Sequence, residues 1–137
     1  MKNGMNPELG LTILRVVLGV IFVAHGLPKL TGGIEGTVQS FASLGIPAPL
    51  VAAWFVALLE TLGGLMLLVG FLVTPVSLLL VLHMLTGILL VHAPNGFYVV
   101  GAQASGGIEF NLLLTASLLV MMFCGAGLAA IDNRRSV

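Results

Sequence analysis

Four long apolar stretches make up most of this chain and limit what it can fold into. A helix that crosses a bilayer needs about 17–25 predominantly apolar residues. The stretches run approximately over residues 9–27, 49–71, 75–91 and 106–124. We therefore predict an all-α fold, an integral membrane four-helix bundle with antiparallel neighbours. The connections are short, so residues 1–137 are expected to form a single domain.

Composition supports the same class and excludes several others. Charged residues make up 7% of the chain and hydrophobic residues 58%, whereas soluble domains carry about 25% charged residues. We therefore expect the lipid bilayer to surround the chain. The net charge is zero, so no basic patch is available for nucleic acid. Cys124 is the single cysteine, which excludes an internal disulfide and a C-x-x-C redox pair.

The connection between the first two stretches has a pattern of its own. Pro28 predicts that the first helix ends or kinks there, because proline is disfavoured in a helix interior. Beyond it, Ile34, Val38, Phe41 and Leu44 recur at helical spacing with polar residues between them. This segment is either a short helix on the membrane surface or a loop with a few apolar anchors.

The distribution of basic residues predicts the orientation. Lys2, Arg134 and Arg135 lie on one side of the predicted bundle, with Arg15 shallowly buried on that side, and Lys29 stands alone on the other. Cytoplasmic connections are enriched in Lys and Arg. Both termini are therefore expected to be cytoplasmic.

Ionisable residues interrupt the apolar stretches. An ionisable side chain within hydrocarbon is costly, so it usually faces the bundle interior and often marks a functional site. The interrupting residues are Arg15, His25, Glu60, His83, His92 and Glu109.

Three of these residues are expected to form the deeper of two polar layers. A rise of about 1.5 Å per residue places Glu60 and His83 near the midplane and Arg15 towards the cytoplasmic side. Arg15 could form a structural ion pair with Glu60, or it could pair with Asp132. Glu60 could instead be protonated and hydrogen-bonded, since burial disfavours the charged carboxylate. In the functional interpretation Arg15, Glu60 and His83 line a cavity that binds a polar headgroup or relays a proton.

A second group is expected near the outer face. It contains His25 and Lys29 at the end of the first helix, His92 at the end of the third and Glu109 at the start of the fourth. Two histidines and a glutamate can ligate a divalent metal. His25, His92 and Glu109 are only a weak metal candidate, because no H-x-x-x-H or E-x-x-H spacing occurs. The alternative is a hydrogen-bonded cluster at the interface.

Small and aromatic residues add two further expectations. Gly19, Gly63, Gly64 and Gly70 are expected to let helices approach closely. Trp54 is either an anchor at the membrane boundary or part of a cavity mouth.

An ordered set of short motifs resembles one known family. The motifs are RVVLGVIF from Arg15, HGLPK from His25, LGIP from Leu44, ETLGGLMLLVG from Glu60, GIE from Gly107 and GAG from Gly125. Their order and spacing, over about residues 10–132, resemble the DoxX family of small four-helix bacterial membrane proteins. Many members carry Gly-Pro-Gly where this chain has Gly125-Ala126-Gly127.

The resemblance implies a multi-pass protein of the bacterial inner (plasma) membrane with a quinone-linked redox role. It also implies site residues where the motifs match. The candidates to bind substrate are Arg15, His25, Lys29 and Glu109, with Trp54 added from the residues themselves. In this hypothesis Glu60 and His83 handle protons at a quinone carbonyl, and Arg15 or Lys29 orients an anionic substrate.

The chain carries no haem motif, dinucleotide fingerprint or cysteine pair. A redox role would therefore need a bound quinone or flavin, or a soluble partner subunit. Two alternatives remain open from the sequence. One is a small proton or solute transporter that works as a homo-oligomer. The other is a non-catalytic membrane assembly factor.

Overall fold

The computed structural model describes residues 6–101 and 106–135, and this part of the chain forms helices without strands. All four predicted apolar helices are present. The helices are α1 (Pro7–Thr31), α2 (Glu35–Ser43), α3 (Pro49–Val69), α4 (Val73–Gly87), a π-helical turn η1 (Ile88–His92), a 3-10 turn η2 (Ala93–Asn95), α5 (Glu109–Cys124) and α6 (Asp132–Arg135).

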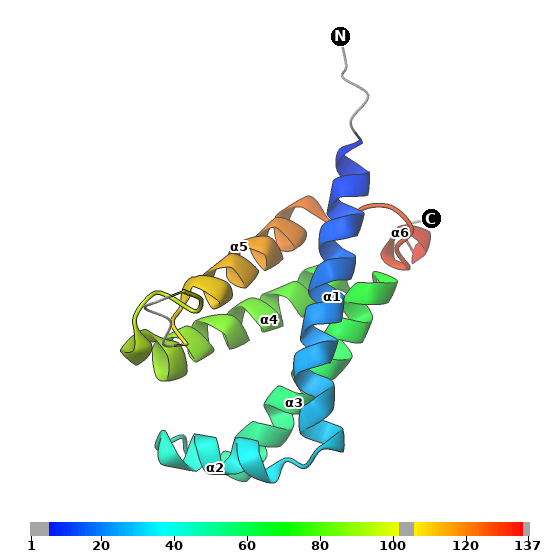
Figure 1. The fold of residues 1–137 in the computed structure, drawn as a ribbon. Coiled ribbons are helices and arrows are strands. Elements are labelled where there is room, and N and C mark those ends of the chain that lie inside the picture. The colour runs from blue at the N-terminus through cyan, green and yellow to red at the C-terminus, as the bar shows by residue number, and fades with distance from the viewer. Residues whose placement is uncertain (1–5, 102–105, 136–137) are drawn as a thin grey trace.

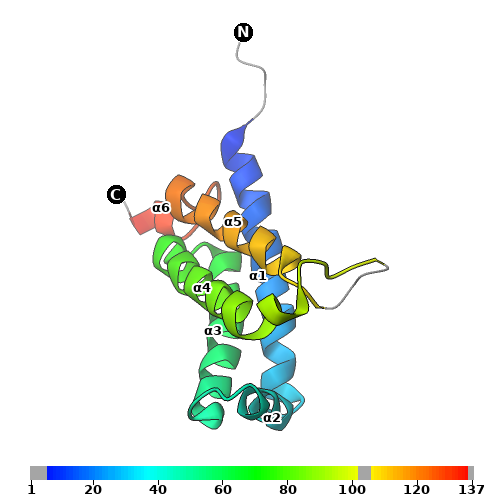
Figure 2. The same ribbon diagram turned by 90° about the vertical axis from the view of Figure 1, so that its left-hand side faces the viewer.

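Two helical hairpins build the molecule. Helices α1 and α3 lie side by side and antiparallel, and the α4–α5 hairpin crosses them obliquely (Figures 1 and 2). The short helix α2 lies at the far end of the α1–α3 pair, whereas the start of α1 and α6 lie together at the opposite end. This placement agrees with termini on one side of the membrane, and the cytoplasmic assignment stays a prediction. Lys2 lies outside the described residues.

The helices suit a bilayer by length and composition. Within the described residues, three helical segments are long and apolar enough to span it: Pro7–Thr31, Pro49–Val69 and Val73–Asn95. Helix α5 is shorter but also apolar. Large apolar side chains on their outer faces, such as Ile13, Val51, Phe55 and Phe123, are exposed. In a membrane-embedded chain such side chains contact lipid tails, which are as apolar as they are, so they need no protein partner.

Helix α1 does not end at Pro28, as its proline suggested, but continues to Thr31. Proline removes one backbone hydrogen bond from a helix interior. Packing on both sides of Pro28 offsets that loss, because Gly26 lies against α3 and Lys29 pairs with Glu60 of α3. Because of this extra turn, Lys29 is part of helix α1 and lies against α3, and it does not belong to the loop after the helix.

The connection after α1 adopts the helical alternative. Helix α2 spans Glu35–Ser43, and its apolar side packs on α3. Ile34 is buried against Ala53 and Ala57, with Val38 and Phe41 beside it. These contacts fix α2 across the end of the α1–α3 pair.

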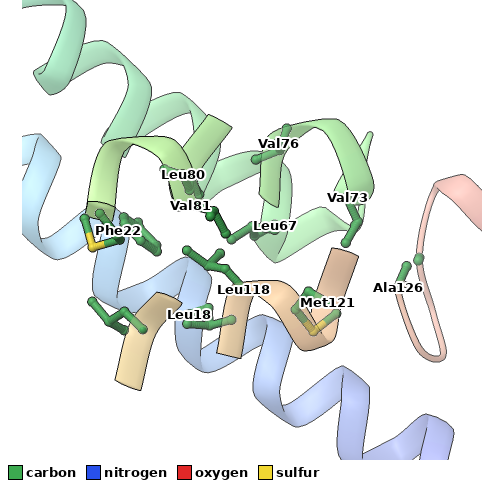
Figure 3. Packing of buried hydrophobic residues seen from close by; sticks show 13 residues of the cluster. Leu18, Phe22, Leu67, Val73, Val76, Leu80, Val81, Leu118, Met121 and Ala126 are labelled. Atoms are coloured by element: carbon green, nitrogen blue, oxygen red, sulfur yellow. The ribbon is translucent and has the colours of Figure 1, made fainter. Parts of the chain in front are cut away.

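The core fills the space where the two hairpins cross. Leu18 and Phe22 of α1 meet Leu67 of α3, Leu80 of α4 and Leu118 of α5 in one buried cluster (Figure 3). Each of these side chains is at most 2% exposed. The crossing point is therefore the rigid centre of the fold, and the two hairpins diverge from it.

Glycines set the distance between α1 and α3, as their positions predicted. A Cβ atom on Gly19 would lie 2.8 Å from the carbonyl oxygen of Gly64, and one on Gly64 would lie 2.8 Å from the carbonyl oxygen of Gly19. About two turns further along α1, a Cβ on Gly26 would lie 2.6 Å from the backbone nitrogen of Thr61. The two backbones are in direct contact at these points, which only glycine permits.

Arg15 does not pair with Glu60, so that structural hypothesis was wrong. Its Nη2 atom donates hydrogen bonds to the carbonyl oxygens of Leu128 and Ala129, at 3.3 and 3.4 Å. Arg15 is 2% exposed, and the Asp132 carboxylate attracts it by charge. Arg15 points towards the end of the bundle that holds the termini, because the chain after α5 folds back over α1 there. Its contacts secure the C-terminal segment.

Asp132 secures the same segment from the other side. Its two carboxylate oxygens accept hydrogen bonds from the backbone nitrogens of Leu72 and Val73, both at 2.8 Å. These N–H groups begin α4 and have no partner within the helix. The side chain thus caps α4 from a distant part of the sequence.

Replacing Asp132 with alanine is expected to lower the free energy of unfolding by about 1–2 kcal/mol, the usual effect of losing a helix cap. Asp132→Asn keeps one carbonyl acceptor and should lose about half as much. Circular dichroism during SDS titration of mixed micelles measures both values. Equal stability of wild type and Asp132→Ala would mean that the carboxylate does not cap α4.

Candidate functional site

The Glu60 carboxylate lies at the meeting point of three helices. Glu60 is 5% exposed and sits midway along α3, where that helix faces both α1 and α4. Its Oε2 atom accepts a hydrogen bond from Nζ of Lys29 on α1 and forms an ion pair with it. Its Oε1 atom is 2.9 Å from Nε2 of His83 on α4. One carboxylate therefore joins a lysine and a histidine from different helices, and we call these three residues the carboxylate triad.

The contacts of Glu60 confirm the predicted depth of His83 and correct the predicted position of Lys29. Glu60 and His83 were predicted at the same level, and they are in hydrogen-bond contact. Lys29 was assigned to a separate outer group together with His25, but it belongs with Glu60. The error came from Pro28: since α1 continues past it, Lys29 stays on the helix and reaches back to α3.

A cavity of about 590 Å³ opens beside the triad. Its lining residues come from α1, α2 and α3 on one side and from α4, η1 and α5 on the other. Its polar lining residues are His25, Lys29, Thr37, Glu60, Thr86, His83, His92 and Asn111. Most of the remaining lining is aliphatic or aromatic, including Phe22, Phe41, Phe55 and Phe110. Pockets for small molecules commonly combine an apolar wall with a few polar groups in this way.

The cavity reaches the lipid-facing surface between α3 and α4. Phe55 of α3 and Leu79, Leu82 and Leu90 of the α4–η1 segment all line it. Each of the four is also exposed on the outside of the molecule, Phe55 by 62%. Apolar side chains that line the cavity therefore also form part of the outer surface of α3 and α4.

Asn111 is a cavity residue that sequence reasoning missed. It lies in the first turns of α5, is 9% exposed and lines the cavity. The search for ionisable residues passed over it because an amide carries no charge. The available signal was a strongly polar side chain within the apolar run 106–124.

Three predicted substrate-binding residues lie outside the cavity lining. Arg15 is at the end of the bundle that holds the termini. Trp54 is 43% exposed on the outer face of α3. The Glu109 carboxylate accepts hydrogen bonds from the backbone nitrogens of Val99 and Val100, at 2.7 and 3.2 Å, so it organises the segment before α5.

The weak metal candidate is not assembled. Within residues 6–101 and 106–135, no three His, Cys, Asp or Glu side chains come close enough to hold a metal ion. His92 Nδ1 lies 2.8 Å from the Gly106 carbonyl oxygen, and Glu109 binds backbone amides. His25 packs instead near the Phe110 ring, with 6.3 Å between ring centroids. His92 and Glu109 both hold the segment between η2 and α5, which keeps them from converging on His25.

Fold and site together define a helical membrane protein with a carboxylate triad, centred on the buried Glu60, on the wall of a largely apolar cavity. Residues 10–93 match the DoxX family, and the chain belongs to that family.

The similar proteins come from bacteria. The chain is 33% identical to "Putative oxidoreductase CatD" of Bacillus subtilis, over 91% of this chain and 86% of that protein. It is 30% identical to "Inner membrane protein YphA" of Escherichia coli, over 90% and 89% of the two chains. It is 29% identical to "Inner membrane protein YqjF" of Escherichia coli, over 92% of each. No solved structure matches the chain.

Proposed function

We propose that this chain is an inner-membrane quinone-binding protein that acts in a redox reaction together with a soluble electron-transfer partner. The observation that carries the proposal is the carboxylate triad on the wall of an apolar cavity that opens towards lipid. Quinones partition into the bilayer and carry carbonyl oxygens that accept hydrogen bonds. The names of the relatives support both the location and the redox class.

The residues of the cavity fit such a ligand. Its apolar wall, with Phe22, Phe41 and Phe110, suits a flat ring and an isoprenoid tail. Lys29 and His83 offer hydrogen-bond donors, and each is oriented by Glu60. A quinone supplies the redox chemistry when bound, since this chain has no other electron-carrying motif.

In the proposed mechanism, proton movement is the task of the triad. Reduction of a quinone to a quinol takes up two electrons and two protons, and we assign the electrons to the soluble partner. His83 and Lys29 would each donate one proton to a quinone carbonyl oxygen, and the Glu60 carboxylate, which contacts both side chains, would hold them in position. General acid–base transfer requires a donor within hydrogen-bond reach and a charge environment that supports both protonation states. Both protons would then be replaced from water through Lys29, whose side chain is 26% accessible and contacts Glu60.

Trp54 provides a direct binding assay. It is the only tryptophan of the chain and precedes Glu60 by six residues, about 9 Å along α3. Menadione added to the protein in lipid nanodiscs should quench its fluorescence saturably. Free N-acetyltryptophanamide with empty nanodiscs is the control for absorption by the quinone.

His83→Leu is expected to weaken menadione binding about tenfold, the usual effect of one hydrogen bond to a charged or polarised group. The titration described above measures it. If the wild type shows no saturable quenching, the quinone proposal fails. Proton flux through vesicles without any redox partner would then favour the transporter alternative.

A further inference from the structure

We propose that the cavity binds its ligand through two polar anchors along one wall and that the side-chain amide of Asn111 is the second anchor. The carboxylate triad is the first anchor. This inference rests on the proposed quinone site and deepens it, because it selects ring compounds with two oxygens at opposite positions.

The side-chain amide of Asn111 is available to a ligand in the cavity. Asn111 is 9% exposed and lines the cavity. Its backbone carbonyl oxygen accepts a hydrogen bond from the Thr115 hydroxyl at 2.7 Å. Its side-chain amide makes no hydrogen bond with any described residue. Because Asn111 lines the cavity, a ligand oxygen there could accept a hydrogen bond from its amide.

The Asn111 amide lies close to α4, the helix that carries His83 of the triad. Gly87 lies four residues after His83 on α4, about one helical turn or 6 Å further along that helix. A Cβ on Gly87 would lie 3.3 Å from Nδ2 of Asn111. The Asn111 amide is therefore about one helical turn beyond His83, on the same side of the cavity.

His92 is the polar neighbour of Asn111 at this part of the cavity. His92 also lies near Gly87, with its Cδ2 atom 4.0 Å from the same Cβ position. However, Nδ1 of His92 is already hydrogen-bonded to the Gly106 carbonyl oxygen. Asn111 has both its donor and its acceptor available. It is thus the better anchor at this end of the cavity.

The spacing selects the chemistry of the ligand. A six-membered ring with oxygens at opposite positions spans roughly one helical turn. Such a ring could accept hydrogen bonds from His83 or Lys29 at one oxygen and from Asn111 at the other. A mono-ketone bound at the triad would leave the Asn111 amide without a partner. Buried donors that lose their partner discriminate strongly between related ligands.

The test compares two probes on three proteins. Menadione has two opposite carbonyls, and alpha-tetralone keeps one carbonyl on the same bicyclic frame. Trp54 fluorescence in nanodiscs gives both affinities for wild type, Asn111→Leu and Asn111→Asp. Asn111→Leu is nearly isosteric and removes both polar groups. Asn111→Asp removes the donor and provides a second variant if Asn111→Leu does not fold.

We expect the wild type to bind menadione about tenfold more tightly than alpha-tetralone, and both variants to lose most of that preference. Affinity for alpha-tetralone should stay within about twofold of the wild-type value. Ser117→Ala on the same helix lies outside the cavity lining and should keep the preference.

The outcomes separate this inference from the proposed function. If menadione binds the wild type but the preference over alpha-tetralone is the same in both variants, Asn111 is not an anchor and the inference is overturned. If menadione does not bind the wild type, the quinone proposal itself is overturned.

Discussion

Replacing Gly26 with alanine is expected to push α1 away from α3 and to destabilise the chain by about 1–3 kcal/mol, the usual cost of overpacking. The added Cβ would lie 2.5 Å from the Thr61 hydroxyl oxygen, 2.6 Å from the Thr61 backbone nitrogen and 2.8 Å from Cβ of Glu60. Backbone cannot rotate out of the way as a flexible side chain can. Because Glu60 is one of the displaced residues, the carboxylate triad should be disturbed as well. SDS titration followed by circular dichroism measures the stability, and Trp54 quenching measures menadione binding.

Gly10 provides the matched control on the same helix. A Cβ on Gly10 would meet nothing within 4 Å. Gly10→Ala should therefore be neutral or stabilising by up to about 1 kcal/mol, because alanine favours the helix more than glycine does. If Gly26→Ala is as stable as Gly10→Ala, α1 and α3 do not approach as closely as the structure describes.

Replacing Glu60 with glutamine is expected to weaken menadione binding about 10–100-fold. The substitution keeps the shape of the side chain but removes its negative charge. Hydrogen bonds to a charged group contribute about 1.5–3 kcal/mol each, and Glu60 makes two such contacts, with Lys29 and His83. Without the charge, neither donor is held in position for a carbonyl oxygen. Trp54 quenching measures the affinity, and SDS titration shows how much stability is lost.

Glu35→Gln is the control for a general effect of losing one carboxylate. Glu35 is exposed at the start of α2 and does not line the cavity. It should bind menadione as the wild type does. A Glu60→Gln protein that is less stable but binds menadione normally would support a purely structural role for the triad, as in a non-catalytic assembly factor.

Much of the fold follows directly from the sequence. The length of each apolar stretch predicted the four main helices, with ends that differ by only a few residues from those of α1, α3 and α5. The glycine positions predicted close helix contacts, and Gly19 and Gly64 make one. The rise per residue brought Glu60 and His83 to one level, where they form a hydrogen bond. These features depend on local spacing, which a sequence states explicitly.

The features that the sequence did not reveal depend on how distant segments meet. Pro28 suggested a helix end, but contacts with α3 carry α1 through it and bring Lys29 to Glu60. The partner of Arg15 was undecided, and it proved to be two carbonyl groups in the C-terminal segment. Asn111 was missed because only ionisable residues were considered. Asn111 matters because it faces the cavity, and that cavity forms only where the two helical hairpins cross.

The central claim is that the cavity beside Glu60 holds a quinone. The most direct measurement is mass spectrometry of small molecules extracted from wild type, Glu60→Gln and Glu35→Gln, each purified from bacterial membranes under identical conditions. We expect a quinone in stoichiometric amounts with wild type and Glu35→Gln, and a marked depletion with Glu60→Gln. A wild type that carries no quinone, or equal amounts in all three proteins, would contradict it.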